Sequence, residues 1–342
     1  MSTEPKSYDF SLFAHAYPPL AISATLKQQP EDFMVEEQLG YPLSGSGEHL
    51  WLWIEKKQQN TDWVARKLAA WLNTGLVNIG FAGQKDRQAI TRQWFSVPCA
   101  MKQVLDLDSF QCEGVRILKA QRHDRKLRRG ELAGNFFHIR LRHLAGSDND
   151  CKAQIEDRLQ QLKQGVPNYY GAQRFGKQCA NLSLGERLLT EPVARDKKRR
   201  SKKRGGQRNL NSLALSAIRS WMFNRLLSAR VEDGNWNSAI AGDSVIDGKV
   251  MGTLFGDQDL QTTEQAFEYE SRVVTEFSQW YQGLRQQRVQ SAQRAFCLQP
   301  KQLSWQWQDD NGQLALLLDF ELPTGCFATV FLRELCELRE PE

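Results

Sequence analysis

Hydrophobic and polar residues alternate with a period of two in three stretches of the chain, which is the pattern of half-buried β-strands. These stretches cover residues 48–57, 134–144 and 303–322. The last one contains Asp310-Asn311-Gly312, and a separate segment contains Asp247-Gly248; both sequences favour tight hairpin turns. We therefore predict strands near both ends of the chain and hairpins at these two turns.

Apolar residues recur with helical spacing in other parts of the chain. A first helix is expected after Asn60-Thr61, which offer capping side chains, with one face formed by Trp63, Val64, Leu68, Trp71 and Leu72. Further helices are expected over residues 152–163, 209–230, 263–288 and 326–336. Strand-rich ends around a helix-rich middle predict one domain inserted into another, in a mixed α/β (α+β) fold.

A length of 342 residues exceeds what one hydrophobic core usually supports, so two domains are expected. No apolar run approaches the ~20 residues that a membrane-spanning helix needs. The amino-terminal sequence MSTEPKSYDF lacks the basic and apolar regions of a secretory signal. We expect a cytoplasmic protein without a membrane partner, and a monomer, since the sequence shows no obvious interface stripe.

Cysteine and histidine residues are scattered along the chain. The seven cysteines include no C-x-x-C pair, and the five histidines include no H-E-x-x-H motif. An odd number of widely spaced cysteines also does not suggest a disulfide framework. We therefore expect reduced thiols and no metal site.

Positive charge is concentrated in two clusters. Residues 195–208 carry nine Lys or Arg against one Asp, and residues 122–129 carry five against one, whereas the whole chain has a net charge of +5. Such density is typical of proteins that bind nucleic-acid phosphates, although a nuclear-localisation signal is an alternative for the first cluster. The candidate RNA-binding residues are Arg125, Lys126, Arg128, Arg129, Lys197, Lys198, Arg199 and Arg200.

One segment matches a phosphate-binding loop only in part. Residues 171–178, GAQRFGKQ, satisfy G-x-x-x-x-G-K, but Gln178 stands where magnesium binding needs Ser or Thr. The preceding residues are too short and polar to form the buried strand that usually leads into such a loop. The chain also lacks the G-x-G-x-x-G loop of dinucleotide-binding domains and the G-x-S-x-G turn of serine hydrolases. We expect no nucleotide cofactor.

Asp86 is the strongest candidate for chemistry. It lies in GFAGQKDRQAITRQWF, residues 80–95, after two glycines that permit unusual backbone angles or close approach. The cations Lys85, Arg87 and Arg92 would favour the ionised carboxylate that a nucleophile requires, and would attract phosphates. A surface turn capped by an aspartate is the simpler alternative. Neither the paired carboxylates of glycosidases nor the carboxylate cluster of two-metal nucleases accompanies Asp86.

This stretch closely resembles the signature of the TruD family, the tRNA pseudouridine-13 synthases. Further blocks resemble that family in the same order: LKQQPEDFMVEE, GEHLWLWIEK, RRGELAGNFFHIRLR, GVPNYYGAQRFG and LPTGCFATVFLREL. Residues 233–262 contain no block of the family that we identify. The resemblance implies an isomerase that converts uridine 13 of tRNA to pseudouridine without a cofactor or metal.

The resemblance also implies a fold and its domains. The expected fold is a pseudouridine-synthase-like mixed sheet, largely antiparallel and flanked by helices, with an inserted α/β TRUD domain. The catalytic domain is expected to cover residues 1–160 and 302–342, and the inserted domain residues 161–301.

The same resemblance assigns the residues of the site. It implies Asp86 as the nucleophile and Lys27 as its basic partner, and it leaves Lys85 as a scaffold or backbone contact. The pocket for the uracil is implied to contain Phe33, Asn135, Phe137 and Phe327, with the ring of Phe137 stacked on the base. Asp86 either attacks C1′ of the ribose or takes part in an elimination from the sugar.

Simpler or different interpretations stay open at this point. Core packing is the alternative role for the phenylalanines, and a solvated side chain is the alternative for Lys27. A catalytically silent RNA-binding or RNA-folding protein is the main alternative function. A nucleotide hydrolase built on residues 171–178 is a weaker one.

Overall fold

The computed structural model describes residues 8–146, 150–190, 204–310, 312–339 and 341, with the backbone alone for 204–209. The chain forms two compact units. The sheet unit comprises Leu20–Lys163, Pro300–Ala328 and Leu335–Glu342, and the helical unit comprises Met1–Pro19, Gln164–Gln299 and Thr329–Glu334. The domain ranges predicted from the sequence, 1–160, 161–301 and 302–342, stay a prediction.

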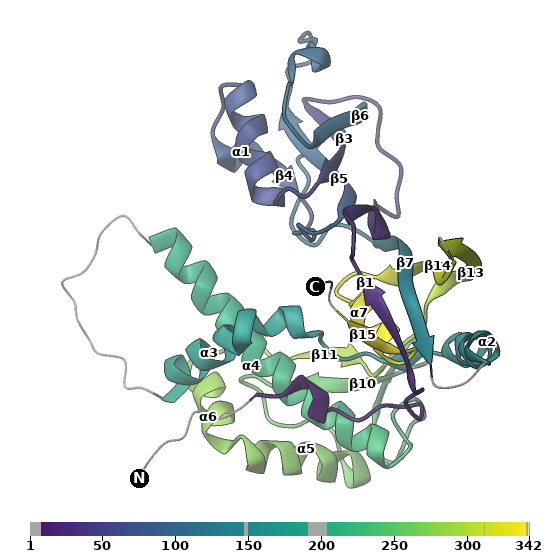
Figure 1. The fold of residues 1–342 in the computed structure, drawn as a ribbon. Helices are drawn as coiled ribbons and strands as arrows, with labels where there is room; N and C mark the ends of the chain where they lie inside the picture. Colours follow the sequence, from purple (N-terminus) through teal and green to yellow (C-terminus); the bar gives the residue numbers. More distant parts are fainter. Residues whose placement is uncertain (1–7, 147–149, 191–203, 311, 340, 342) are drawn as a thin grey trace. The chain divides into compact units, whose positions relative to one another are not determined.

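The sheet unit is built on a ten-stranded mixed sheet (Figure 1). Seven strands follow the order β13-β14-β7-β2-β5-β3-β6, while β1 pairs with β7 and β15, and β4 pairs with β5. Only the pairs β1–β15 and β2–β5 are parallel among the described strands. The strands are β1 (Ile22–Leu26), β2 (Phe33–Gln38), β3 (His49–Lys57), β4 (Gly80–Phe81), β5 (Ile90–Pro98), β6 (Val115–His123), β7 (Gly134–Gly146), β13 (Lys301–Asp310), β14 (Gln313–Pro323) and β15 (Glu337–Arg339).

Two helices accompany this sheet, α1 (Thr61–Trp71) and α2 (Cys151–Leu162). The predicted apolar face of α1 is confirmed, since Val64 and Leu68 are fully buried in a cluster with residues of β3 and β5. The predicted side-chain cap is wrong: the side chain of Asn60 at the N-cap makes no capping hydrogen bond. The hydroxyl of Thr61 donates instead to Gln93 Oε1 at 2.9 Å, which ties the start of α1 to β5.

One face of the central strands positions the site described below. Phe33, Val35 and Glu37 alternate with outward residues along β2 and therefore share a face. The register places Val35 opposite Phe137 and Glu37 opposite Asn135 of β7. Side chains from neighbouring strands therefore meet on this face although they lie about 100 residues apart in sequence.

The helical unit contains α3 (Ala180–Thr190), α4 (Arg204–Glu232), α5 (Glu264–Glu276), α6 (Ser278–Gln286) and α7 (Ala328–Arg333), whose first residue belongs to the sheet unit. Short strands accompany them: β8 (Val166–Pro167), β9 (Ser244–Ile246), β10 (Lys249–Leu254), β11 (Ala292–Ala295) and β12 (Cys297–Leu298). The hairpin at Asp247-Gly248 is confirmed, with φ of 48° and 74° at these two residues. The helical stretch predicted over 263–288 is confirmed, but Phe277 leaves helical geometry with φ −113° and ψ 37° and divides the stretch into α5 and α6.

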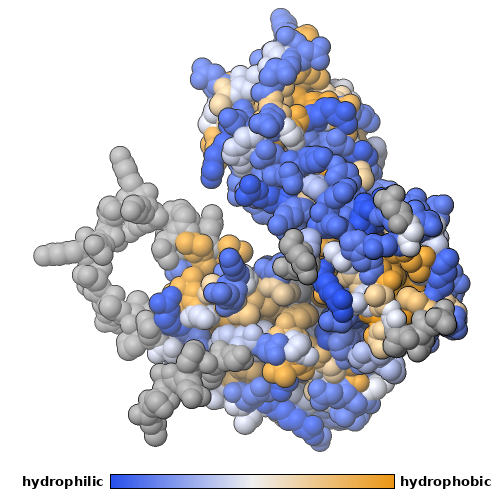
Figure 2. Space-filling view, viewed as in Figure 1, coloured by the Kyte–Doolittle hydropathy of each residue, from blue (hydrophilic) through white to orange (hydrophobic). Residues whose placement is uncertain are grey.

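The view in Figure 2 shows hydrophilic residues over much of the visible surface, with smaller hydrophobic areas between them. Among the helices of the described residues, none combines the length and apolar character needed to cross a bilayer.

Candidate active site

Lys27 is the first residue after β1, in the segment that connects β1 to β2. Both of these strands pair with β7. Leu26 pairs with Leu141, and Phe33 pairs with Ile139, so the chain leaves the sheet between them. Lys27 adopts φ of 62°, in the left-handed region that costs a non-glycine residue about 1 kcal/mol. Such conformations persist where the surrounding structure enforces them, often at functional sites. Here the turn directs the lysine side chain to Asp86.

Lys27 and Asp86 form an ion pair across 59 residues of sequence, from Nζ to Oδ2. The other carboxylate oxygen of Asp86, Oδ1, accepts the backbone N–H of Gln88 at 3.2 Å. The side chains of Lys27 and Asp86 are 13% and 25% exposed, so water screens the pair only in part. The structure therefore brings the two residues together, while their roles in a reaction stay predictions.

The three cations near Asp86 in sequence contact other groups. Lys85 Nζ forms an ion pair with buried Glu37 at 2.7 Å, and the Lys85 backbone N–H donates to Thr61 Oγ1 at 3.0 Å. Arg92 pairs with Glu55 at 2.9 Å and also with Glu36. Arg87 donates from Nε to the Gln58 carbonyl at 3.3 Å. These contacts hold the loop in place, and the carboxylate of Asp86 is paired instead with Lys27.

A buried lysine that the sequence analysis missed holds the backbone of Asp86. Lys56 is 0% exposed, and its Nζ donates to the carbonyl oxygens of Asp86 at 2.9 Å and Gln59 at 2.7 Å. The alternating pattern of β3 could have indicated this burial, because Lys56 lies on the same face of the strand as the buried residues Leu52 and Ile54. A charged residue on the apolar face of a strand needs a partner.

Burial lowers the pKa of Lys56 to about 8; the nearby Lys85 charge acts in the same direction and the Asp86 charge opposes it. The folded protein then releases this proton at lower pH than the unfolded chain, so stability rises as pH increases above about 8. Between pH 7.5 and 9.5 we expect the wild type to gain about 2 kcal/mol of unfolding free energy relative to Lys56→Met. Urea unfolding of both proteins at each pH measures this, and a difference independent of pH would contradict it.

Three phenylalanine rings form a connected aromatic group beside the ion pair. Lys27 Nζ lies 4.2 Å from the ring centre of Phe33. Phe33 meets Phe137 edge to face with ring centres 6.1 Å apart, and Phe137 stacks on Phe320 at 5.4 Å. Phe320 was not predicted as a site residue, because alternation along its strand marks it only as a core position. Phe33 and Phe137 are 5% and 6% exposed, so both rings are largely covered in this structure.

Asn135 stands on the same face of β7 as Phe137. Its amide oxygen Oδ1 is buried and has no hydrogen-bond partner among the described residues. Buried polar atoms are nearly always bonded, so this oxygen is suited to accept an N–H group of a ligand. Phe327 is half-buried and lies between β14 and α7. The Thr324 N–H donates to the Ala133 carbonyl at 3.2 Å, which keeps this segment beside the first residues of β7.

Comparison with known proteins decides the family. The sequence profile of tRNA pseudouridine synthase D (TruD) matches residues 14–197 and 186–278, and tRNA pseudouridine synthase D of Hydrogenovibrio crunogenus is 40% identical over 98% of this chain and 99% of that protein. The chain belongs to the TruD family. The Cellvibrio japonicus protein of the same name is 39% identical, over 98% of this chain and 96% of that protein.

A solved structure from Methanosarcina mazei, described by the TruD name, confirms the predicted fold. It has a TM-score of 0.72 with 19% identity and covers 94% of this chain and 95% of that chain. The TruD profile also includes residues 233–262, where the sequence analysis identified no block of the family. The match to the family profile therefore extends through that segment.

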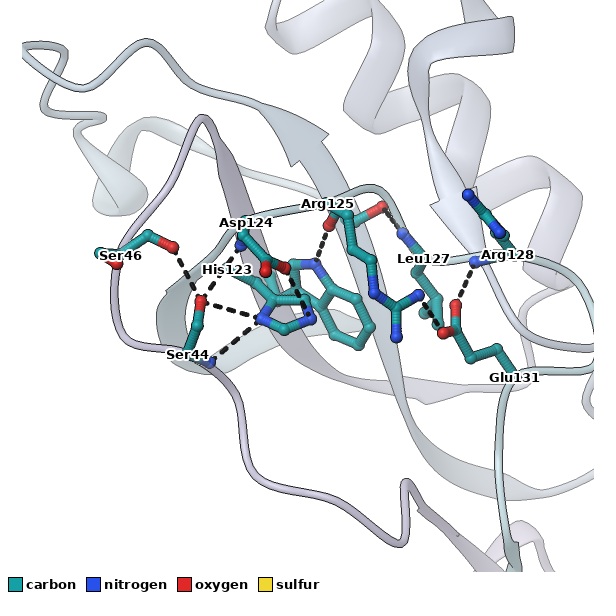
Figure 3. Close-up of polar contacts among 10 residues, drawn as sticks. Ser44, Ser46, His123, Asp124, Arg125, Leu127, Arg128 and Glu131 are labelled. Atoms are coloured by element: carbon teal, nitrogen blue, oxygen red, sulfur yellow. Dashed lines mark hydrogen bonds and ion pairs between the residues drawn. The ribbon is translucent and has the colours of Figure 1, made fainter.

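Figure 3 shows the second basic cluster of this TruD-family chain. Arg125 forms an ion pair with Glu131, whose other oxygen accepts the Arg128 backbone N–H at 2.9 Å. Indole Nε1 of Trp51 donates to the Arg125 carbonyl at 2.9 Å. Lys126 Nζ donates to the Val77 carbonyl. The Arg125 and Lys126 side chains therefore also brace their own loop.

Arg128 and Arg129 are the more accessible members of this cluster. Arg128 is exposed, and the Arg129 side chain is 60% exposed, with its guanidinium 3.7 Å from the ring centre of Phe81 and 3.8 Å from Asp62. The remaining candidates, Lys197, Lys198, Arg199 and Arg200, lie outside the described residues.

The interpretation of the glycines near Asp86 needs correction. Of the two glycines before Asp86, Gly80 is required, because a Cβ there would overlap the Leu127 carbonyl oxygen, but neither has an unusual φ and Gly83 has room for a side chain. The segment 171–178 is a packing element, with Phe175 fully buried and Arg174 donating to Ser220 at 3.2 Å. Two short 3-10 turns, Ala172–Phe175 and Lys177–Cys179, occupy most of this segment, so no α-helix begins directly at its Gly-Lys pair.

Proposed function

We propose that this protein converts uridine to pseudouridine at position 13 of tRNA, with Asp86 as the nucleophile and Lys27 as its basic partner. The observation that carries the proposal is the half-buried Lys27–Asp86 ion pair next to an aromatic group, in a chain of the TruD family. Two relatives that span nearly the whole chain are named tRNA pseudouridine synthase D, which supports tRNA as the substrate class.

The reaction requires a carboxylate next to the ribose and side chains that hold the uracil while it is detached from the sugar. The N1–C1′ bond of uridine breaks, the uracil turns, C5 bonds to C1′, and the proton of C5 is lost while N1 gains one. The Asp86 carboxylate either attacks C1′ or takes part in an elimination from the sugar, and the Lys27 ammonium holds it in position. The buried Oδ1 of Asn135 supports a role as acceptor for a uracil N–H group during this turn.

The aromatic residues are proposed to enclose the base. A uracil that stacks on Phe137 gains dispersion contact without a fixed rotation. Because Phe137 is 6% exposed, entry of the base requires neighbouring side chains to move aside. Phe33 and Phe327 complete the proposed pocket.

Access to a uridine inside folded tRNA requires its extrusion, which costs a few kcal/mol. We propose that phosphate contacts offset this cost. Within the described residues, the exposure of Arg128 and Arg129 favours them over Arg125 and Lys126, which also brace the loop. From the sequence alone, we also propose phosphate contacts for the four positive charges of residues 197–200. We propose action in the cytoplasm, as a monomer and without a nucleotide cofactor.

Tritium release tests the proposed activity directly. With tRNA transcribed from uridine labelled at C5, we expect the wild type to release label from position 13, and a transcript with cytidine at that position to show no such release. RNA binding without release would favour a silent RNA-binding protein. Release that strictly requires ATP would favour the nucleotide hydrolase. The role of the basic residues in phosphate binding is tested separately. The salt dependence of binding to the same RNA is measured for the whole protein and for a variant that lacks residues 197–204.

A further inference from the structure

A polar cavity of ≈ 770 Å³ shares Asp86 with the site described above. This volume falls within the range of about 300–1,000 Å³ that is usual for small-molecule sites. Its lining comes from three loops at one end of the sheet, and consists of Lys57, Gln58, Gln59, Asp86, Arg87, Gln88, Glu113 and Gly114. This lining includes no member of the aromatic group that is proposed to enclose the uracil.

The backbone around this cavity is held by the buried ammonium of Lys56. Its two hydrogen bonds, to the carbonyls of Gln59 and Asp86, join the loop after β3 to the loop before β5. Gln59 Nε2 further contacts the Glu113 carbonyl of the third loop at 3.4 Å. The cavity walls are therefore fixed before a ligand enters, which lowers the entropy cost of binding.

Arg87, Gln58 and Gln88 are exposed to solvent, and each carries polar groups without a partner among the described residues. Arg87 uses Nε for the Gln58 carbonyl, and its two terminal amines have no partner among the described residues. The side-chain amides of Gln58 and Gln88 likewise make no hydrogen bond within the described part of the chain. A guanidinium with free terminal amines matches a phosphate, and an amide carries both the donor and the acceptor that a base edge requires.

We propose that this cavity binds the nucleotide adjacent to the target uridine in the RNA strand, with Arg87 on its phosphate and the amides of Gln58 and Gln88 on its base. The inference rests on the proposed function, because a target ribose held at Asp86 directs the next nucleotide into the space that shares this residue. Bases of single-stranded RNA are read in this way, by hydrogen bonds to their exposed edges.

Steady-state kinetics of pseudouridine formation test the cavity. For Arg87→Gln we expect KM for tRNA to rise about tenfold, as the loss of one charge-assisted contact implies, with kcat within about twofold of the wild type. The slope of log KM against log salt concentration should fall by about one. Gln88→Ala should also raise KM by a few fold, because it removes a neutral hydrogen-bonding group and leaves the backbone N–H that binds Asp86 in place.

Arg66→Gln is the matched control, because Arg66 is an exposed arginine on α1 that does not line the cavity. If Arg87→Gln and Gln88→Ala both show the KM and salt slope of this control, the cavity does not bind the RNA. If the wild type forms no pseudouridine, the proposed function fails, but its affinity for tRNA can still be measured. The affinity of Asp86→Asn for tRNA is then compared with that of the double variant Asp86→Asn/Arg87→Gln. Equal affinities overturn the inference about the cavity.

Discussion

Asp86→Asn is expected to abolish pseudouridine formation while tRNA binding remains. The amide keeps the size of the side chain and can still accept the Gln88 N–H, but it lacks the charge that a nucleophile requires. Loss of a covalent nucleophile lowers kcat on the order of 10⁴-fold or more in other enzymes. Release of tritium from C5-labelled tRNA in a single turnover measures the chemical step, and filter binding measures the affinity.

Asp259→Asn provides the matched control for this change. Asp259 has a side chain that is 83% exposed and lies in the helical unit, so the same exchange of carboxylate for amide should leave kcat unchanged. If Asp86→Asn released tritium at the rate of this control, Asp86 would not be the nucleophile. If Asp86→Asn instead lost its RNA affinity along with its activity, the residue would serve binding rather than chemistry.

Lys27→Met is expected to lower kcat by about 10²–10³-fold with a smaller change in KM. Methionine has a similar length and keeps an apolar side chain against the Phe33 ring, but it removes the cation that pairs with Asp86. The carboxylate is 25% exposed, so the loss of its partner leaves a charge that water compensates only in part. The Asp86 carboxylate then loses both its fixed orientation and the charge that balances it.

Lys163→Met is the control for this variant. Lys163 also places its ammonium near an aromatic ring, 4.9 Å from the centre of Trp305, but its hydrogen bond goes to the neutral Gln160. The double variant Asp86→Asn/Lys27→Met should be no slower than Asp86→Asn alone, because the two residues act as one unit. Additive losses in the double variant, or activity of Lys27→Met equal to that of Lys163→Met, would contradict the proposed partnership.

Local patterns predicted the strands β3, β7, β13 and β14, but not β1, β2, β5 or β6. The Asp247-Gly248 turn forms its hairpin because both residues tolerate positive φ, and the apolar face of α1 is buried as its spacing predicts. The helix predicted over 263–288 shows the limit of such patterns. Apolar spacing continues through the break at Phe277, so the division into α5 and α6 leaves little trace in the local sequence.

The contacts of Asp86 illustrate a different limit. Proximity in sequence suggested Lys85, Arg87 and Arg92 as the cations that act on this carboxylate. In the structure Lys85, on the loop before β5, pairs with Glu37 of β2. Arg92 of β5 pairs with Glu36 of β2 and Glu55 of β3, because side chains on neighbouring strands meet across the sheet. The Lys27–Asp86 pair came from the family resemblance, since no local pattern relates two residues separated by 59 positions.

By itself, the sequence determined the family, several of the strands and the hairpins, and the identity of the proposed nucleophile, because motifs and hydrophobic periods are properties of short segments. Only the tertiary structure decided that Lys85, Arg87 and Arg92 contact other groups, that buried Lys56 holds the Asp86 backbone, and that a polar cavity adjoins Asp86. These depend on strand register and on the turn at Lys27, which bring distant segments together. The surroundings of Asp86 are thus formed by residues on or next to β1, β3 and β6, which are distant from it in the sequence.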